Sequence, residues 1–173
     1  MNNTDPTAKL GKYFIWLAWI VVFALLVFVF QSLIEEQLNP NSQPEYSLNA
    51  QGKAEVILEQ NRQGHYVTSG TINGIPVTFL LDTGATQVSI PAQVADALNL
   101  TTTGQGIANT ANGQVKIYQT RLDQLSIGNI YLYNVGAHIN PGMKSDEILL
   151  GMSALKQLEF SQTGKQLILR ERN

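Results

Sequence analysis

An uninterrupted apolar run near the N-terminus constrains the fold of this chain more than any other feature. Every residue from Tyr13 to Phe30 is apolar or aromatic (YFIWLAWIVVFALLVFVF). Extended to Ile34, the run has about 20 residues, the length that a helix needs to cross the hydrocarbon core of a bilayer. A helix that is apolar on all sides has no polar face to present to water, so it does not suit the surface of a soluble domain. The sequence therefore predicts a transmembrane helix over residues 13–34.

Charged residues on the two sides of this run predict its orientation. Lys9 and Lys12 precede it, and Glu35 and Glu36 follow it. Because basic residues favour the cytoplasmic side of a membrane, residues 1–12 are expected in the cytoplasm and the part beyond the helix outside it.

A cleaved signal peptide is the alternative interpretation of the apolar run. The apolar region of a signal peptide is usually about 7–15 residues long and ends at a small-x-small cleavage site. The run here is longer, and the QSLIEEQLNP stretch that follows contains no such site. A retained membrane anchor is therefore favoured.

The sequence beyond the anchor divides into a polar segment and one domain. Residues 35–51 contain two prolines and many polar residues, which predicts a linker. Residues 52–173 form short runs of strand-like sequence, separated by turn signals such as Asn73-Gly74. Strand signals that recur about every 8–12 residues predict an all-β barrel or sandwich with one or two short helices.

Composition and motif content exclude several kinds of chemistry. The chain has no cysteine, so disulfides and cysteine-based metal sites are excluded. Its two histidines, His65 and His138, do not form a zinc-binding His-Glu-x-x-His motif. His65 is interpreted as a structural or surface residue, and His138 as a structural one. The formal net charge of −2 offers no basic surface for a nucleic acid.

A serine in the GMSAL stretch resembles a nucleophile only in part. The stretch, residues 151–155, approaches the G-x-S-x-G nucleophile motif but ends in Leu155 instead of glycine. Ser153 is therefore interpreted as a residue at the start of a helix.

One acid stands between two stretches that both have the pattern of buried strands. In FLLDTGATQVSI, Asp82 follows a nearly continuous apolar run and precedes another apolar alternation. Asp and Gly are common turn residues, so the tripeptide D-T-G by itself fits a simple turn. An unpaired carboxylate between buried strands is costly, however, and a second carboxylate that shares one proton with it relieves this cost. The residues alone thus leave Asp82 as either a turn residue or a catalytic acid.

Five motifs in chain order resemble those of the retropepsin-like (clan AA) aspartic proteases of the bacterial, membrane-anchored type. They are GHY at 64–66, ING at 72–74, DTGAT at 82–86, TANG at 110–113 and LLGMSAL at 149–155. The resemblance implies a closed retropepsin-like β-barrel over residues 52–173. It also implies an aspartic endopeptidase that needs no metal and no cofactor.

The resemblance assigns roles to the active-site loop. Asp82 matches the catalytic aspartate, and Thr83 matches the residue whose hydroxyl connects the two active-site loops of a dyad. Gly84 matches the glycine that lets the backbone approach the carboxylates. Ala85 stands where pepsin-like enzymes usually have serine.

Two further segments match parts of the family's site. The flap that closes over substrate matches Thr110, Ala111, Asn112 and Gly113. The segment that packs beneath the active-site loop matches Leu149, Leu150 and Gly151.

The number of D-T-G motifs implies an assembly. The chain has one such motif, whereas peptide hydrolysis by this mechanism needs one carboxylate as base and another as acid. The resemblance therefore implies a homodimer with Asp82 of each subunit at a twofold axis. The runs AEVILEQ (54–60) and KQLILRE (165–171) are expected to be edge strands that pair between subunits.

The resemblance and the charge bias together predict the location and the substrate. The protease domain is expected in the periplasm, held to the inner membrane of a Gram-negative bacterium by its helix. The substrate is expected to be a protein or peptide with apolar residues beside the cleaved bond. The alternative function is a non-catalytic periplasmic dimerisation or peptide-binding module on the same fold.

Overall fold

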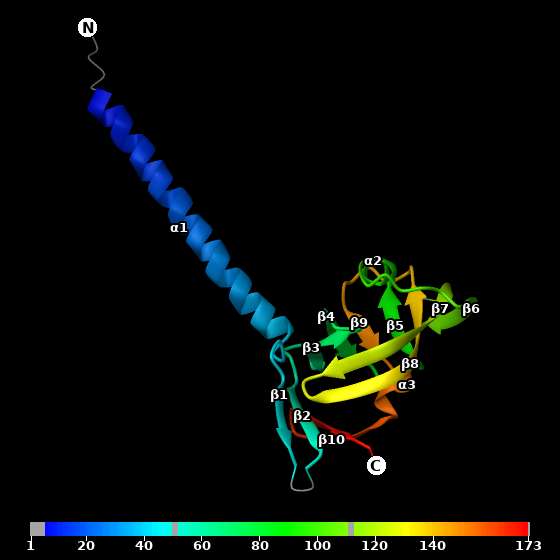
Figure 1. Cartoon of the computed structure of the whole chain (residues 1–173). Helices are drawn as coiled ribbons and strands as arrows, with labels where there is room; N and C mark the ends of the chain where they lie inside the picture. The colour runs from blue at the N-terminus through cyan, green and yellow to red at the C-terminus, as the bar shows by residue number, and fades with distance from the viewer. Residues whose placement is uncertain (1–5, 50–51, 111–112, 173) are drawn as a thin grey trace. The chain divides into compact units, whose positions relative to one another are not determined.

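The structure, a computed structural model, describes residues 6–49, 52–110 and 113–172. The chain separates into two compact units, one up to Gln37 and one from Leu38 onward. The first unit is a single helix, α1 (Pro6–Leu38), drawn in blue in Figure 1. The stretch Gly11–Leu38 is long and apolar enough to cross a membrane. The helix extends beyond residues 13–34 at both ends, and it stops before Asn39-Pro40 because a residue that precedes proline disfavours the helical conformation.

The second unit contains two β-sheets and two short helices. The four-stranded sheet has the order β1-β2-β11-β10, and the seven-stranded sheet has the order β3-β4-β9-β5-β8-β7-β6. Figure 1 shows β7 and β8 as the longest pair of strands. The strands are β1 (Glu45–Leu48), β2 (Ala54–Glu59), β3 (Val67–Ile72), β4 (Ile75–Leu81), β5 (Val88–Pro91), β6 (Gly104–Thr110), β7 (Gly113–Ile127), β8 (Ile130–Asn140), β9 (Ile148–Leu150), β10 (Leu158–Thr163) and β11 (Gln166–Glu171). The helices are α2 (Ala92–Ala97) and α3 (Met152–Leu155).

A pairing between β3 and β7 closes the larger sheet into a barrel. Thr71 pairs with Ser126 and Ile72 with Leu125, so the ring of strands returns to β3. The Asn73-Gly74 turn between β3 and β4 has φ angles of 50° and 80°, the left-handed conformation that a two-residue hairpin of this type requires. The predicted all-β barrel with short helices is confirmed.

One continuous hydrophobic core connects the two sheets. Val56 and Leu169 of the smaller sheet and Phe79 and Leu122 of the barrel belong to it, and all four side chains are fully buried. Along β2, apolar residues at alternate positions face this core while the residues between them face outward, as expected for a strand with one buried face.

Of the segment predicted as a linker, residues 35–51, the described part contains the end of α1 and strand β1, whereas residues 50 and 51 lie outside the described residues. Asn41 is buried, and its side chain donates hydrogen bonds to the carbonyl oxygens of Glu59 (2.9 Å) and Val67 (2.6 Å). Its Oδ1 atom accepts a hydrogen bond from the Glu59 N–H (2.7 Å). Asn41 therefore joins β2 to β3, a role that the polar composition of this segment did not reveal.

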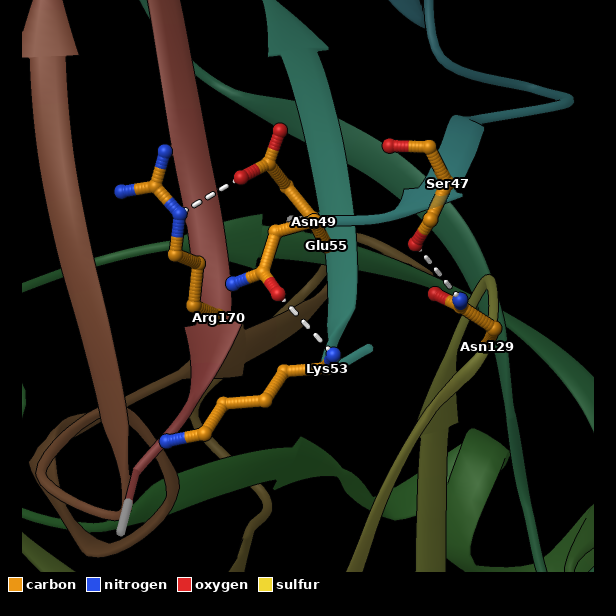
Figure 2. A network of polar contacts seen from close by, with 6 residues as sticks. All are labelled: Ser47, Asn49, Lys53, Glu55, Asn129 and Arg170. Atoms are coloured by element: carbon orange, nitrogen blue, oxygen red, sulfur yellow. Dashed lines mark hydrogen bonds and ion pairs between the residues drawn. The ribbon is translucent and has the colours of Figure 1, made fainter. Parts of the chain in front are cut away.

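Strand β1 adds a further strand where linker was expected. It pairs antiparallel with β2, and Figure 2 shows the polar contacts around it. Asn129, in the turn between β7 and β8, donates to the Ser47 carbonyl oxygen (3.0 Å). On the neighbouring strands, Glu55 of β2 forms an ion pair with Arg170 of β11. These contacts tie the smaller sheet together and attach its first strand to the barrel.

The prediction that the runs 54–60 and 165–171 lie at sheet edges is wrong. They form β2 and β11, the two inner strands of the smaller sheet. The edges are β1 and β10, because β1 covers β2 and the C-terminal hairpin places β10 outside β11.

Candidate active site

The Asp82 loop begins where strand β4 ends. Asp82 donates its backbone N–H to the Leu150 carbonyl oxygen (3.2 Å) of the parallel neighbour β9. The Ala85 N–H donates to the Asp82 carbonyl oxygen (3.2 Å), which closes a tight turn. The Gly84 N–H donates to Oδ1 of the Asp82 side chain (2.8 Å). Asp82 thus makes the turn contact considered above, and this contact orients its half-buried carboxylate.

The segment beneath the loop is held to it by backbone contacts. Met152 donates its N–H to the Ala85 carbonyl oxygen (2.8 Å), and Ser153 donates to that of Thr86 (3.1 Å). A Cβ atom on Gly151 would lie 2.3 Å from the Gln87 carbonyl oxygen. Glycine is therefore required here by the close approach of two backbone segments.

Ser153 has a positioning role that its sequence context did not reveal. Its Oγ atom donates to the Gly136 carbonyl oxygen (2.6 Å) of β8 and accepts from the Val88 N–H (3.0 Å) of β5. A small polar residue at a helix start is common, so no local signal identified these partners, which lie 17 and 65 residues away. The side chain connects α3 to β5, which follows the Asp82 loop, and to β8, the neighbour of β5 in the barrel.

A cavity of about 690 Å³ lies beside the Asp82 carboxylate. Gly84 and Ala85 line it from the loop, Leu149 lines it from β9, and Thr110 lines it from β6. Among the described residues, no three His, Asp or Glu side chains lie close enough together to hold a metal ion.

The remaining described residues of the predicted site do not line this cavity. Thr83 is exposed and lines a second cavity, of about 380 Å³, that Asp82 also borders. Leu150 is fully buried beneath the loop. Gly113 pairs with Thr110 at the end of the β6–β7 hairpin, whereas Ala111 and Asn112 lie outside the described residues.

His138 lines the larger cavity, although it was interpreted from the sequence as a structural residue. It lies on β8, is 9% exposed, and its Nδ1 atom is 3.5 Å from Oε1 of Gln87. Burial lowers the pKa of the His138 imidazole below its ordinary value of 6.5, because the charged form loses hydration.

The buried imidazole predicts a pH-dependent stability. Since the pKa of His138 is lower in the folded chain, the unfolded chain binds its proton more readily, and stability falls as the pH drops below about 6.5. We expect a His138→Gln variant to lose less of its melting temperature than the wild type between pH 7.5 and pH 5.5. Thermal unfolding of the full-length protein in detergent measures this. The control is His65→Gln, at an exposed position, whose melting temperature should change with pH as that of the wild type does. Equal losses of melting temperature in the wild type and in His138→Gln would contradict the prediction.

A closed β-barrel with a D-T-G loop supported by an L-L-G segment defines the class of retropepsin-like aspartic proteases. The chain belongs to the gag-polyprotein putative aspartyl protease family, which matches residues 68–157. A solved structure of a retropepsin-like aspartic protease from Rickettsia conorii has a TM-score of 0.57 and 27% sequence identity to this chain. The similarity covers 73% of this chain and 95% of that protein. The predicted retropepsin-like fold and family are confirmed.

Two curated relatives are themselves uncharacterised proteins. One, from the 5′ region of cobV in Sinorhizobium sp., is 33% identical over 117 residues, and one from Rickettsia prowazekii is 27% identical over 118 residues. Each match covers 66% of this chain and 50% of the relative. The chain therefore spans about half the length of the curated relatives that it matches.

Proposed function

We propose that this protein is an aspartic endopeptidase that hydrolyses peptide bonds with a dyad of Asp82 residues from two subunits. The observation that carries the proposal is the position of Asp82 on the border of both cavities. One cavity is bounded by the β6–β7 hairpin and suits a peptide. The other is bounded by the edge strand β10 and suits a second subunit.

The proposed reaction needs no group beyond the two carboxylates and a water molecule. One carboxylate removes a proton from water as the water attacks the peptide carbonyl carbon, and the protonated carboxyl group donates its proton to the carbonyl oxygen. Two carboxylates in close contact do not both ionise, so the pair shares one proton and supplies both roles. The Gly84 N–H bond to Asp82 Oδ1 supports this reaction because it holds the carboxylate in one orientation.

The proposed dimer interface lies along β10. Phe160 on this edge strand is 46% exposed and lines the smaller cavity together with Asp82 and Thr83. The Tyr66 hydroxyl, in the same lining, is buried and has no hydrogen-bond partner among the described residues. A partner subunit would cover the exposed ring and supply a polar group to this hydroxyl. The other edge, β1, lies at the opposite side of the sheet and does not border Asp82.

We further propose that the β6–β7 hairpin is the flap. Thr110 Oγ1 donates to the Gly113 carbonyl oxygen (2.8 Å), which supports the hairpin end. Ile107 of β6 lines the larger cavity but is 70% exposed, so a bound peptide would cover an apolar side chain that the single chain leaves open to water.

The proposed location follows from helix α1 and its flanking charges. Residues 1–12 lie in the cytoplasm, residues 13–34 cross the inner membrane, and the protease domain lies in the periplasm. Two anchored subunits share one membrane plane, which raises their effective concentration and favours a weak dimer.

Digestion of a diverse peptide library by the full-length protein in detergent tests the proposal. The oligomeric state is measured in the same sample by sedimentation. Cleavage by a dimer is the expected result. A dimer that binds peptides without cutting them would instead support the non-catalytic module.

A charge on β10 is expected to separate the subunits. In a Phe160→Glu variant, each subunit would bring a carboxylate into the apolar interface, where an unpaired charge is costly. We expect the dimer dissociation constant to rise at least about 100-fold and peptide cleavage to fall with the dimer population. Tyr131→Glu is the matched control, because Tyr131 is similarly exposed (49%) but does not line the cavity beside Asp82. An unchanged dissociation constant in Phe160→Glu would exclude β10 as the interface.

A further inference from the structure

The wall of the larger cavity carries a polar row where apolar subsites were expected. In the strand register, Leu149 of β9 lies opposite Ser89 of β5, and Ser89 lies opposite His138 of β8. Asn140 lies two positions after His138 on β8, so these two side chains share one face of the sheet. Gln87 lies in the bend immediately before β5, two positions before Ser89. All five residues line the cavity that Asp82 borders.

Hydrogen bonds within the row leave part of its hydrogen-bonding capacity unused. The 3.5 Å contact between His138 Nδ1 and Gln87 Oε1 fits a neutral imidazole that carries its proton on Nδ1. Nε2 is then an acceptor, and no hydrogen bond to it is recorded among the described residues. Asn140 Oδ1 accepts from the Gly142 N–H (2.9 Å), which directs the donor Nδ2 away from that turn. The row thus offers an acceptor on His138 and a donor on Asn140. Beside them lie the Gln87 Nε2 group, which has no partner among the described residues, and the Ser89 hydroxyl, which donates to Met143 Sδ (3.2 Å).

We infer that this row is a substrate subsite that selects a carboxamide side chain, that of glutamine or asparagine, on the peptide. The inference rests on the proposed function and changes its expected substrate class from apolar to polar at this subsite. A carboxamide donates through its NH₂ group and accepts through its oxygen, which matches the acceptor on His138 and the donor on Asn140.

Charge and desolvation favour the neutral carboxamide over other side chains. Asp82 is the one charged residue among the described residues of the lining. An acidic side chain would therefore meet a like charge. A basic side chain would find no carboxylate to pair with other than Asp82, which the proposed reaction uses. An apolar side chain would remove water from His138 and Asn140 without replacing its hydrogen bonds. Burial also lowers the pKa of His138, so the imidazole keeps its acceptor into the mildly acidic range.

Peptide pairs that differ only in glutamine or leucine at one position test the inference. A peptide library is first digested with the full-length protein in detergent. This identifies the positions beside the cleaved bond at which the protein distinguishes between side chains. At one of them we expect kcat/KM to favour glutamine over leucine by about 10- to 100-fold. His138→Leu should remove or reverse this ratio. His138→Gln, which keeps a hydrogen-bonding group, should retain much of it.

Binding to an inactive variant separates this inference from the proposed function. The affinity of each peptide for Asp82→Asn protein is measured by fluorescence anisotropy, with and without His138→Leu. Tighter binding of the glutamine peptide that depends on His138 supports the subsite even if wild-type protein cuts nothing, an outcome that would overturn only the proposed function. Equal affinities, or a glutamine preference unchanged by His138→Leu, would overturn the subsite while leaving proteolysis intact.

Discussion

Replacing Asp82 with asparagine is expected to abolish peptide cleavage while leaving the fold and the dimer intact. In a homodimer the substitution removes both the general base and the general acid, so we expect kcat to fall at least about 10³-fold. The fold should persist because an asparagine Oδ1 atom can accept the same hydrogen bond from the Gly84 N–H that Asp82 accepts now. The measurement is peptide hydrolysis by full-length protein in detergent, with thermal unfolding and sedimentation of the same samples.

Asp96→Asn is the matched control for this substitution. Asp96 lies on the exposed surface of α2 and does not line the cavity, so the same change of charge there should leave hydrolysis unchanged. If Asp82→Asn retained wild-type activity, Asp82 would be a turn residue only.

Mixed dimers test whether both carboxylates of the dyad come from Asp82. When wild-type and Asp82→Asn chains are co-expressed in equal amounts and assort at random, about a quarter of the dimers carry two wild-type aspartates. At the same total protein concentration, the activity of the mixture should therefore be about a quarter of the wild-type activity. A fall to one half would mean that each subunit acts alone.

The sequence predicted the parts of the fold that depend on local signals. The Asn73-Gly74 turn was predictable because only a few residue types accept two consecutive positive φ angles. The apolar run before Asp82 indicated a strand, and the structure places this run as β4 between β3 and β9. The expected burial on both faces is wrong, because in β4 only Phe79 is buried. Both features depend on neighbours in the chain, which sequence patterns record.

The features that were not predictable depend on partners distant in sequence. The polar segment after α1 resembled a linker until the contacts of Asn41 with β2 and β3 were known. His138 resembled a structural histidine because its position beside Ser89 arises only when β5 and β8 pair. Ser153 was assigned to a helix start, but its two hydrogen bonds reach β5 and β8. Polarity patterns identify which face of a strand is buried, but they do not identify the strand that lies next to it.

Gly151→Ala is expected to damage both the stability of the fold and the position of the active-site loop. Gly151 has φ −87° and an extended backbone, which any residue adopts, so its conformation does not require glycine. Space does, because the added Cβ would lie 2.3 Å from the Gln87 carbonyl oxygen and 2.7 Å from that of Ala85. Both neighbours are backbone atoms of the active-site segment, so relief requires the segment itself to move. We expect a loss of about 3 kcal/mol in the free energy of unfolding, at the upper end for overpacking.

The same displacement should reduce activity more than the lost stability alone would. Residues 150–152 hold the loop through the bond from the Asp82 N–H to the Leu150 carbonyl oxygen and through the Met152 N–H bond to Ala85. A shift of about 1 Å in a catalytic group costs on the order of 100-fold in rate, so hydrolysis should fall by at least that factor at a temperature where the variant remains folded. Gly136→Ala is the matched control, since its Cβ would meet only Gln87 Nε2, at 3.9 Å. If Gly151→Ala had the same free energy of unfolding and the same rate of hydrolysis as the wild type, the loop would have adapted to the added methyl group. The L-L-G segment would then not determine the position of Asp82.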